Sequence, residues 1–272
     1  MHGLGNDYVV IDDRQKRIDE KDIQELARRL CRRGFSVGAD GVLLVRNSNT
    51  ADIKMRIFNS DGSEAEMCGN GVRCIAKYCY DNKIVDKKTI DVETNAGIRR
   101  LVILTGGRSV ANVRADMGMP SFKRKDLPMI GEGECIDEPI NVGDEKLRIT
   151  CVSMGNPHCV LFVSDLESRS IRETGSLLER HSSFPKGTNV EFVRIQNSQE
   201  IAVRTWERGV GETSACGTGA CASVAAANRL GKTGNRVQVN LSGGVLFVEL
   251  GKTLTLEGEV EKVFEGQLFQ DD

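Results

Sequence analysis

Two cysteines of this 272-residue chain, Cys68 and Cys216, occupy the same position in two similar glycine-rich turns. The turns read Cys68-Gly69-Asn70-Gly71 and Cys216-Gly217-Thr218-Gly219, and a helix-like segment follows each of them. The start of a helix carries unpaired N–H groups and a partial positive charge, and glycine lets the backbone approach an anion closely. Both features lower the pKa of a thiol from its free value of about 8.5. We therefore expect each turn to hold a carboxylate and to activate its cysteine as a thiolate.

The two turns belong to a repeat that runs through most of the chain. The alternating segment Ile53–Phe58 corresponds to Ile201–Trp206, and at the same offset Glu64 corresponds to Glu212 and Cys68 to Cys216. With small shifts, the correspondence extends to Gly5-Asn6 with Gly155-Asn156, Phe35 and Gly38 with Phe184 and Gly187, and Ala96-Gly97-Ile98 with Gly243-Gly244-Val245. Repeats of this kind indicate a duplicated fold. A lone cysteine is more often a core residue, but the duplicated position makes Cys68 and Cys216 functional candidates.

Each half of the repeat predicts the same order of elements. A strand follows the Gly-Asn pair, an amphipathic helix follows the strand, and two further strands lead to the cysteine turn, which opens a second helix. In the first half, the amphipathic helix places Ile23, Leu26, Ala27 and Leu30 on one face, and Gly34 is its stop signal. In the second half, residues 221–227 are apolar on nearly all sides, which indicates a helix enclosed by its own domain.

These patterns predict an α+β fold of two pseudo-symmetric domains that arose by internal duplication. We expect each domain to be a curved, mostly antiparallel sheet wrapped around a central helix, with the active site in the interdomain cleft. The N-terminal domain is placed at residues 1–116, with residues 259–272 returning to it, and the C-terminal domain at residues 117–258. A duplicated fold would present one cysteine from each side of the cleft, which suits a reaction that needs two mirror-related groups.

Composition excludes several classes of partner. The net charge is −2 and the basic residues are scattered, so neither a nucleic-acid groove nor a membrane surface is expected. The nine cysteines are an odd number and lie mostly in apolar stretches, which indicates free thiols in a reducing compartment, the cytoplasm. No signal-peptide pattern opens the sequence. The three histidines lack the spacing of metal ligands, so no metal site is expected.

Three alternative functions fit parts of the pattern. The segment 217–222 matches the loose dinucleotide fingerprint, but no strand directly precedes it, as that fingerprint requires. A hydrolase could pair Cys216 with His158, although this would leave the second cysteine turn without a purpose. A non-catalytic protein that binds amino acids also suits two domains around a cleft, and it would leave the stereochemistry of its ligand unchanged.

Five motifs in order resemble the diaminopimelate epimerase family. They are His2-Gly3-Leu4-Gly5-Asn6-Asp7, Asn59-Ser60-Asp61-Gly62-Ser63, Met67-Cys68-Gly69-Asn70-Gly71-Val72-Arg73-Cys74, Met154-Gly155-Asn156-Pro157-His158-Cys159, and Glu207-Arg208-Gly209-Val210-Gly211-Glu212-Thr213 followed by Ala215-Cys216-Gly217-Thr218-Gly219. Proline-racemase-like relatives differ, since they carry His in place of Asn70 and an Asp-Arg-Ser-Pro stretch before the second cysteine. The resemblance implies an isomerase that interconverts LL- and meso-2,6-diaminopimelate on the route to lysine and peptidoglycan, without pyridoxal phosphate or metal, as a homodimer.

The resemblance also implies roles for individual residues. Cys68 and Cys216 resemble the acid–base pair, and His158 and Glu207 the groups that tune which sulfur holds the proton, with a purely structural histidine as the alternative for His158. The residues that resemble substrate contacts are Asn6, Asn59, Gly69, Asn70, Asn156, Asn189, Glu207, Arg208, Gly217 and Thr218. Family members often have Gln where this chain has Gly41, so a contact from that side chain must be absent here.

Overall fold

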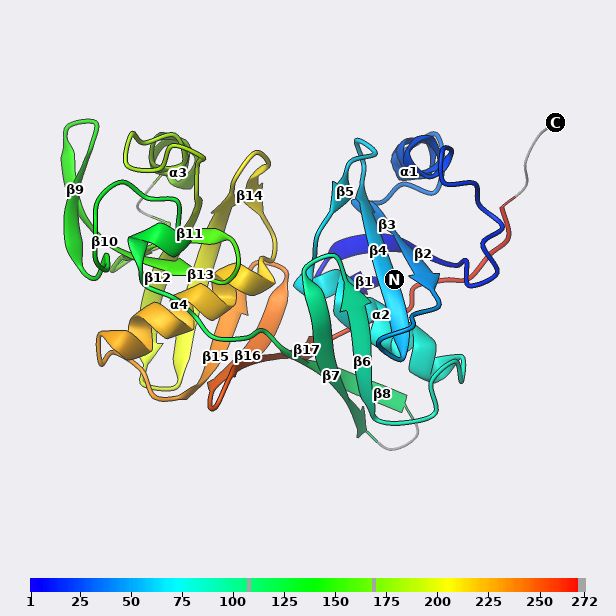
Figure 1. Ribbon diagram of the computed structural model, residues 1–272. Helices are drawn as coiled ribbons and strands as arrows, with labels where there is room; N and C mark the ends of the chain where they lie inside the picture. Colours follow the sequence, from blue (N-terminus) through cyan, green and yellow to red (C-terminus); the bar gives the residue numbers. More distant parts are fainter. Residues whose placement is uncertain (107–108, 168–169, 269–272) are drawn as a thin grey trace. The chain divides into compact units, whose positions relative to one another are not determined.

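The computed structural model describes residues 1–106, 109–167 and 170–268, and the chain forms two compact units (Figure 1). Unit 1 comprises Met1–Arg114 with Glu259–Asp272, and unit 2 comprises Ala115–Gly258. The boundary expected from the sequence, after residue 116, lies two residues further along the chain. No helix in the described part of the chain is long and apolar enough to cross a membrane.

The described residues of unit 1 form two helices and eight strands. In chain order they are β1 (His2–Gly3), β2 (Asn6–Asp12), α1 (Ile23–Cys31), β3 (Gly41–Arg46), β4 (Ile53–Asn59), β5 (Glu64–Ala65), α2 (Gly69–Asp81), β6 (Thr89–Thr94), β7 (Gly97–Gly106) and β8 (Ser109–Asp116). Antiparallel ladders join β1 to β2, β3 to β4, β4 to β5 and β6 to β7. Parallel ladders join β2 to β3 and β4 to β6.

The sheet of unit 1 is covered by a helix on each face. Strand β3 is buried along its whole length because alternate side chains meet different helices. Val42 and Leu44 pack with Ile23, Ala27 and Leu30 of α1, whereas Leu43 points to α2. Helix α2 contacts six strands of its own sheet and is buried from its first residue through Lys77. The predicted amphipathic helix is therefore confirmed, and it ends at Cys31, shortly before Gly34 with its positive φ of 80°.

Unit 2 repeats this arrangement. Its elements are the 3-10 turn η1 (Arg124–Asp126), β9 (Glu138–Val142), β10 (Glu145–Ser153), β11 (Pro157–Phe162), α3 (Ile171–Glu179), β12 (Asn189–Asn197), β13 (Glu200–Glu207), β14 (Gly211–Thr213), α4 (Gly217–Arg229), β15 (Arg236–Leu241), β16 (Gly244–Leu250) and β17 (Leu254–Glu259). Helix α4 crosses the strands of its own sheet (Figure 1), and its residues from Gly219 to Ala227 are buried. The central helix of this unit is therefore confirmed.

Strand pairing shows that the two units have one topology. In unit 1, β2 pairs parallel with β3, and β4 pairs parallel with β6. The equivalent strands of unit 2 pair in the same way, β11 with β12 and β13 with β15. The predicted α+β class is confirmed, and most ladders are antiparallel as expected. The described residues of each unit nevertheless form two parallel ladders, because a crossover connection through a helix joins each parallel pair of strands. The first crossover passes through α1 in unit 1 and α3 in unit 2, and the second passes through α2 and α4.

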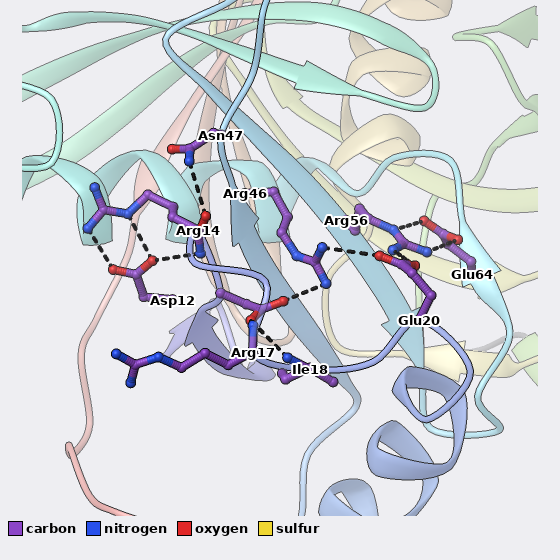
Figure 2. Close-up of polar contacts among 10 residues, drawn as sticks. Asp12, Arg14, Arg17, Ile18, Glu20, Arg46, Asn47, Arg56 and Glu64 are labelled. Carbon is purple, nitrogen blue, oxygen red and sulfur yellow. Dashed lines mark hydrogen bonds and ion pairs between the residues drawn. The ribbon is translucent and has the colours of Figure 1, made fainter.

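Equivalent ion pairs brace the strand that leads to each cysteine turn. The Arg56 guanidinium donates to both carboxylate oxygens of Glu64, at 2.8 and 2.9 Å, and Arg204 donates to Glu212 at 2.8 Å. Figure 2 shows that in unit 1 the network continues through Glu20, which lies between Arg56 and Arg46. Because these pairs join β4 to β5 and β13 to β14, they fix the approach to Cys68 and Cys216 within each unit.

Candidate functional site

Each cysteine caps the N-terminus of the central helix in its own unit. The Cys68 sulfur accepts a hydrogen bond from the Gly71 N–H at 3.5 Å, and the Cys216 sulfur accepts one from the Gly219 N–H at 3.3 Å. Gly69 and Gly217 are the first residues of α2 and α4. The glycine turns therefore place each thiol against unpaired N–H groups and the positive end of a helix dipole, the setting that stabilises a thiolate or a bound carboxylate.

In unit 1, polar side chains from β2 and α2 converge on Cys68. The Tyr8 hydroxyl lies 2.9 Å from the Cys68 sulfur and donates to the Asn6 side-chain oxygen at 2.6 Å. That oxygen also accepts from the Asn70 amide at 3.2 Å. Asn6, Cys68 and Asn70 are thus brought together as the sequence implied. The sequence pattern predicts only a strand position for Tyr8. Its spacing after Asn6 matches that of His158 after Asn156, which is the one sequence signal for its role.

A buried arginine lies beneath this turn. Arg73 has no solvent exposure, and its guanidinium donates to the Asn70 side-chain oxygen at 2.8 Å and to the Gly69 carbonyl at 3.2 Å. It therefore orients the Asn70 amide so that the N–H₂ group faces Asn6. Its position within the motif that follows Cys68 was visible in the sequence, but its role as an internal support required the structure.

In unit 2, Cys216 lies at the end of a chain of polar side chains. The Thr218 hydroxyl lies 3.5 Å from the Cys216 sulfur and accepts from the Asn156 amide at 3.3 Å. The Asn156 oxygen lies 3.0 Å from Nε2 of His158. His158 therefore reaches Cys216 through two intervening side chains, which is unlike the direct contact between nucleophile and base in a Cys-His hydrolase.

The electrostatic setting of Cys216 corrects one expectation. Burial, followed by the negative charges of Glu207 and Glu191, raises the pKa of the Cys216 thiol well above its ordinary value, while the hydrogen bonds from Thr218 and Gly219 lower it. The helix terminus, considered alone, predicts a lowered pKa for this thiol. For this cysteine the loss of hydration and the nearby carboxylates outweigh the helix, so the thiol form is favoured in this state.

Three further predicted residues, Asn189, Glu207 and Arg208, lie around the turn at the end of β13. The Asn189 oxygen accepts from the Arg208 backbone N–H at 2.9 Å, and the Asn189 amide donates to the Pro157 carbonyl at 2.9 Å. Glu207 accepts from the Thr213 hydroxyl at 2.6 Å. Asn189 is 5% exposed and its side chain is occupied by these bonds, so it shapes the turn that carries Arg208.

The remaining predicted residues, Gly41 and Asn59, lie opposite each other in the ladder between β3 and β4. The Asn59 amide donates to the Ser63 hydroxyl at 2.9 Å and is exposed. A Cβ atom on Gly41 would lie 2.6 Å from the Phe58 carbonyl oxygen and 3.2 Å from the Tyr8 ring. The site therefore has no room for a side chain at this position. No group of three or more His, Cys, Asp or Glu residues in the described ranges could hold a metal ion.

Solved structures with the same fold include an epimerase and a proline racemase. A predicted epimerase from Pseudomonas aeruginosa superposes with a TM-score of 0.71 at 17% identity, covering 98% of this chain and 94% of that one. A probable proline racemase from Agrobacterium radiobacter, with bound carbonate, gives a TM-score of 0.68 at 19% identity over 93% of this chain and 82% of that one. At these identities the likeness defines the fold class alone.

Sequence comparison identifies the family within that class. The diaminopimelate epimerase family matches residues 1–123 and 150–263. Diaminopimelate epimerases from Pelotomaculum thermopropionicum and Moorella thermoacetica are 49% and 48% identical, each over 98% of this chain and 96% of the relative. One from Methanothermobacter thermautotrophicus is 47% identical over 100% of this chain and 98% of its own length. The chain belongs to the diaminopimelate epimerase family, which confirms the resemblance found in the sequence.

Proposed function

We propose that this enzyme interconverts LL- and meso-2,6-diaminopimelate by moving a proton at one α-carbon between two cysteines, Cys68 and Cys216. The observation that carries the proposal is the duplicated thiol: each cysteine caps the central helix of its unit and accepts from the N–H of the glycine three residues later. Inversion of a carbon centre needs an acid and a base on opposite faces. Two equivalent thiols meet that need without any other group changing its charge.

The two helix starts supply the stabilisation that the reaction requires. The α-hydrogen of an amino acid is far less acidic than a thiol, so the carbanion must be stabilised as it forms. Its charge develops on the α-carboxylate, which we assign to the turns formed by Gly69 and Asn70 and by Gly217 and Thr218. Backbone N–H groups and helix dipoles that are oriented in advance act on this charge without reorganisation, and such terms usually dominate the lowering of the barrier.

The environment of Cys216 divides the roles for one direction. A buried sulfur beside two carboxylates holds its proton, as the raised pKa of Cys216 indicates. This environment supports Cys216 as the thiol that returns a proton, and the family resemblance assigns Cys68 as the thiolate that removes one when LL-diaminopimelate is the substrate. In the reverse direction the two sulfurs exchange roles. Glu207 acts through its charge on Cys216.

Recognition of the second amino-acid centre is assigned to polar groups in both units. The substrate carries two ammonium and two carboxylate groups, so it needs a guanidinium for a carboxylate, a carboxylate for an ammonium, and amides that donate and accept. Arg208, Glu207 and Asn156 have these chemistries in unit 2, and Asn6 and Asn59 have them in unit 1. Asn189 contributes by holding the Arg208 backbone.

The family assignment supports three further proposals. The reaction proceeds with the chain's own thiols, without pyridoxal phosphate or metal. The place of the reaction is the route to lysine and to peptidoglycan precursors in the cytoplasm, and the working form is a homodimer. Sedimentation of the reduced protein tests the last proposal, and activity after exhaustive dialysis against a chelator tests the first.

Isotope incorporation in heavy water tests the two-cysteine mechanism. The thiol that protonates the carbanion has already exchanged with solvent, whereas the abstracted proton stays on the other sulfur and returns only to the starting isomer. Early in a reaction from LL-diaminopimelate, deuterium should therefore enter the inverted carbon of the product and hardly enter recovered substrate. The Cys68→Ala and Cys216→Ala variants should each lose epimerisation, and their losses should not add. Equal early label in substrate and product would exclude two separate bases.

A further inference from the structure

A histidine and a glutamate are hydrogen-bonded to each other in the interior of unit 2. Nδ1 of His158 on β11 lies 2.7 Å from Oε1 of Glu191 on β12, and neither side chain has any solvent exposure. The other carboxylate oxygen of Glu191 is also buried and has no hydrogen-bond partner among the described residues. Burial of charged groups is costly even when they are paired, and a well-packed apolar residue often serves the fold as well or better. The pair therefore calls for a reason other than stability.

The other unit shows what the fold itself requires at this position. In the parallel ladders, Tyr8 is opposite Gly41 in unit 1 and His158 is opposite Asn189 in unit 2, so Gly41 and Asn189 are equivalent. Two residues after them come Leu43 in unit 1 and Glu191 in unit 2, which are therefore equivalent as well. A Cβ atom on Gly71 would lie 3.1 Å from the Leu43 methyl group, and one on Gly219 would lie 2.7 Å from the Glu191 carboxylate. The two side chains thus pack against equivalent turns of the two central helices, and leucine is sufficient for the packing.

A continuous series of hydrogen bonds runs from Glu191 to Cys216. A carboxylate accepts only, so Nδ1 of His158 donates to Glu191. The Asn156 amide donates to Thr218 at 3.3 Å, which turns the Asn156 oxygen towards Nε2 of His158 at 3.0 Å. Both ring nitrogens therefore face oxygen acceptors. Because Thr218 accepts from Asn156, its own proton is free to be donated to the Cys216 sulfur at 3.5 Å.

We propose that Glu191 is a positioning residue for the acid–base thiol: it holds His158 as a donor at both ring nitrogens and thereby orients Asn156 and Thr218 towards Cys216. The proposal rests on the proposed function, because orientation of this chain matters only if Cys216 exchanges protons with a substrate. It assigns a purpose to a buried carboxylate that the duplicated fold does not need. The negative charge of Glu191 also contributes to the raised pKa of Cys216, which shows that the two groups are coupled electrostatically as well.

Replacement of Glu191 by the residue of the equivalent position separates this role from folding. Glu191→Leu should fold, with a thermal midpoint equal to or above that of the parent protein, because it places in unit 2 the side chain that unit 1 already accommodates. Its kcat for diaminopimelate should fall roughly 10- to 100-fold, the scale expected when a hydrogen bond to a charged group is lost, while KM changes little. Glu191→Gln keeps an acceptor for Nδ1 and should recover part of kcat. Glu200→Leu, the same change at the opposite end of β13 from Glu207, is the matched control and should leave kcat unchanged.

Nitrogen NMR of the imidazole rings provides a readout that needs no substrate. The chain has three histidines, and His2 and His181 serve as internal references. The parent protein, labelled with ¹⁵N-histidine, should show His158 with both ring nitrogens protonated. The Glu191→Leu variant should show His158 with one unprotonated ring nitrogen. Unchanged His158 signals together with unchanged kcat in Glu191→Leu would overturn the inference. If the parent protein does not epimerise diaminopimelate, the proposed function is overturned. A changed His158 spectrum in Glu191→Leu would in that case still show that Glu191 determines the state of His158.

Discussion

The Tyr8 hydroxyl lies 2.9 Å from the Cys68 sulfur and 2.6 Å from the Asn6 side-chain oxygen. This placement lets it serve both protonation states of the cysteine. It can accept from the thiol while it donates to Asn6, and it can donate to the sulfur once the proton has left. Burial, followed by the charge of Cys68, raises the pKa of Tyr8 well above its ordinary value, so the phenol keeps the proton that this exchange requires.

Removal of the hydroxyl alone should therefore slow the reaction. Tyr8→Phe is expected to lower kcat roughly 10- to 150-fold, which corresponds to about 1.5–3 kcal/mol for a hydrogen bond to a charged group. The aromatic ring is retained in its buried position, so the thermal midpoint should change little. Steady-state kinetics from both isomers measure the effect. Parent-like kcat in both directions would show that the contact has no part in proton transfer.

Two equivalent glycines offer a paired test of the cysteine turns. A methyl group at Gly219 would lie 2.7 Å from the Glu191 carboxylate, which His158 holds in place, whereas one at Gly71 would lie 3.1 Å from a leucine methyl group. Gly219→Ala should therefore lower kcat more than tenfold and more strongly than Gly71→Ala. Alanine also raises helix propensity by about 1 kcal/mol over glycine, so unfolding by urea should remain close to that of the parent. An equal loss in the two variants would contradict the role given to Glu191.

Loss of the Arg208 guanidinium should weaken substrate recognition. Arg208→Gln is expected to reduce kcat/KM for diaminopimelate roughly 10- to 100-fold, mainly through KM, since an ionic hydrogen bond contributes about 1.5–3 kcal/mol. Arg194→Gln, on the part of β12 remote from Asn189, is the control. Initial rates over a range of substrate concentrations separate the two parameters. A fall confined to kcat would place Arg208 at the reacting carbon.

Buried thiols of α2 should make the fold sensitive to alkali. Burial raises the pKa of Cys74 and of Cys79 to about 12. Below pH 9 the folded and unfolded chains both hold these protons, and the thiols contribute nothing to the pH dependence. Between pH 9 and 12 only the unfolded chain loses them, so the free energy of unfolding should fall by about 1.4 kcal/mol per pH unit for each thiol.

Urea titrations at a series of alkaline pH values measure this slope. The Cys74→Ala/Cys79→Ala variant will be less stable at every pH because of the cavity, but its free energy of unfolding should decline less steeply above pH 9. An identical slope in the variant and the parent would assign the alkaline sensitivity to other groups.

The repeat made the fold predictable from the sequence, because the same Cys-Gly-x-Gly turn and the same alternating strand occur twice. The position of each cysteine at a helix start followed from glycine and capping chemistry alone. The pair of Glu191 and His158 left no such local signal. Its members are 33 residues apart, and the segment around Glu191 has the pattern of a buried strand, in which a single glutamate normally faces solvent.

The state of Cys216 was also beyond local reasoning. A helix terminus is visible in the sequence, but the burial of the sulfur and the approach of Glu207 and Glu191 depend on β13 and β12 meeting α4. Tyr8 shows the intermediate case. Its spacing from Asn6 matched that of His158 from Asn156, and alignment of the halves would have indicated it, but only the structure places its hydroxyl on Cys68.

The backbone bonds between His2 and Glu261, at 3.0 and 2.9 Å, have a consequence for biosynthesis. Glu261 belongs to unit 1 but is translated after all of unit 2. At elongation rates of about 5–20 residues per second, β1 therefore waits on the order of ten seconds or more for this partner, with one edge unpaired. Unit 2 is the first whose residues are all available to fold. The nascent chain thus completes its units in the reverse of their order in the sequence.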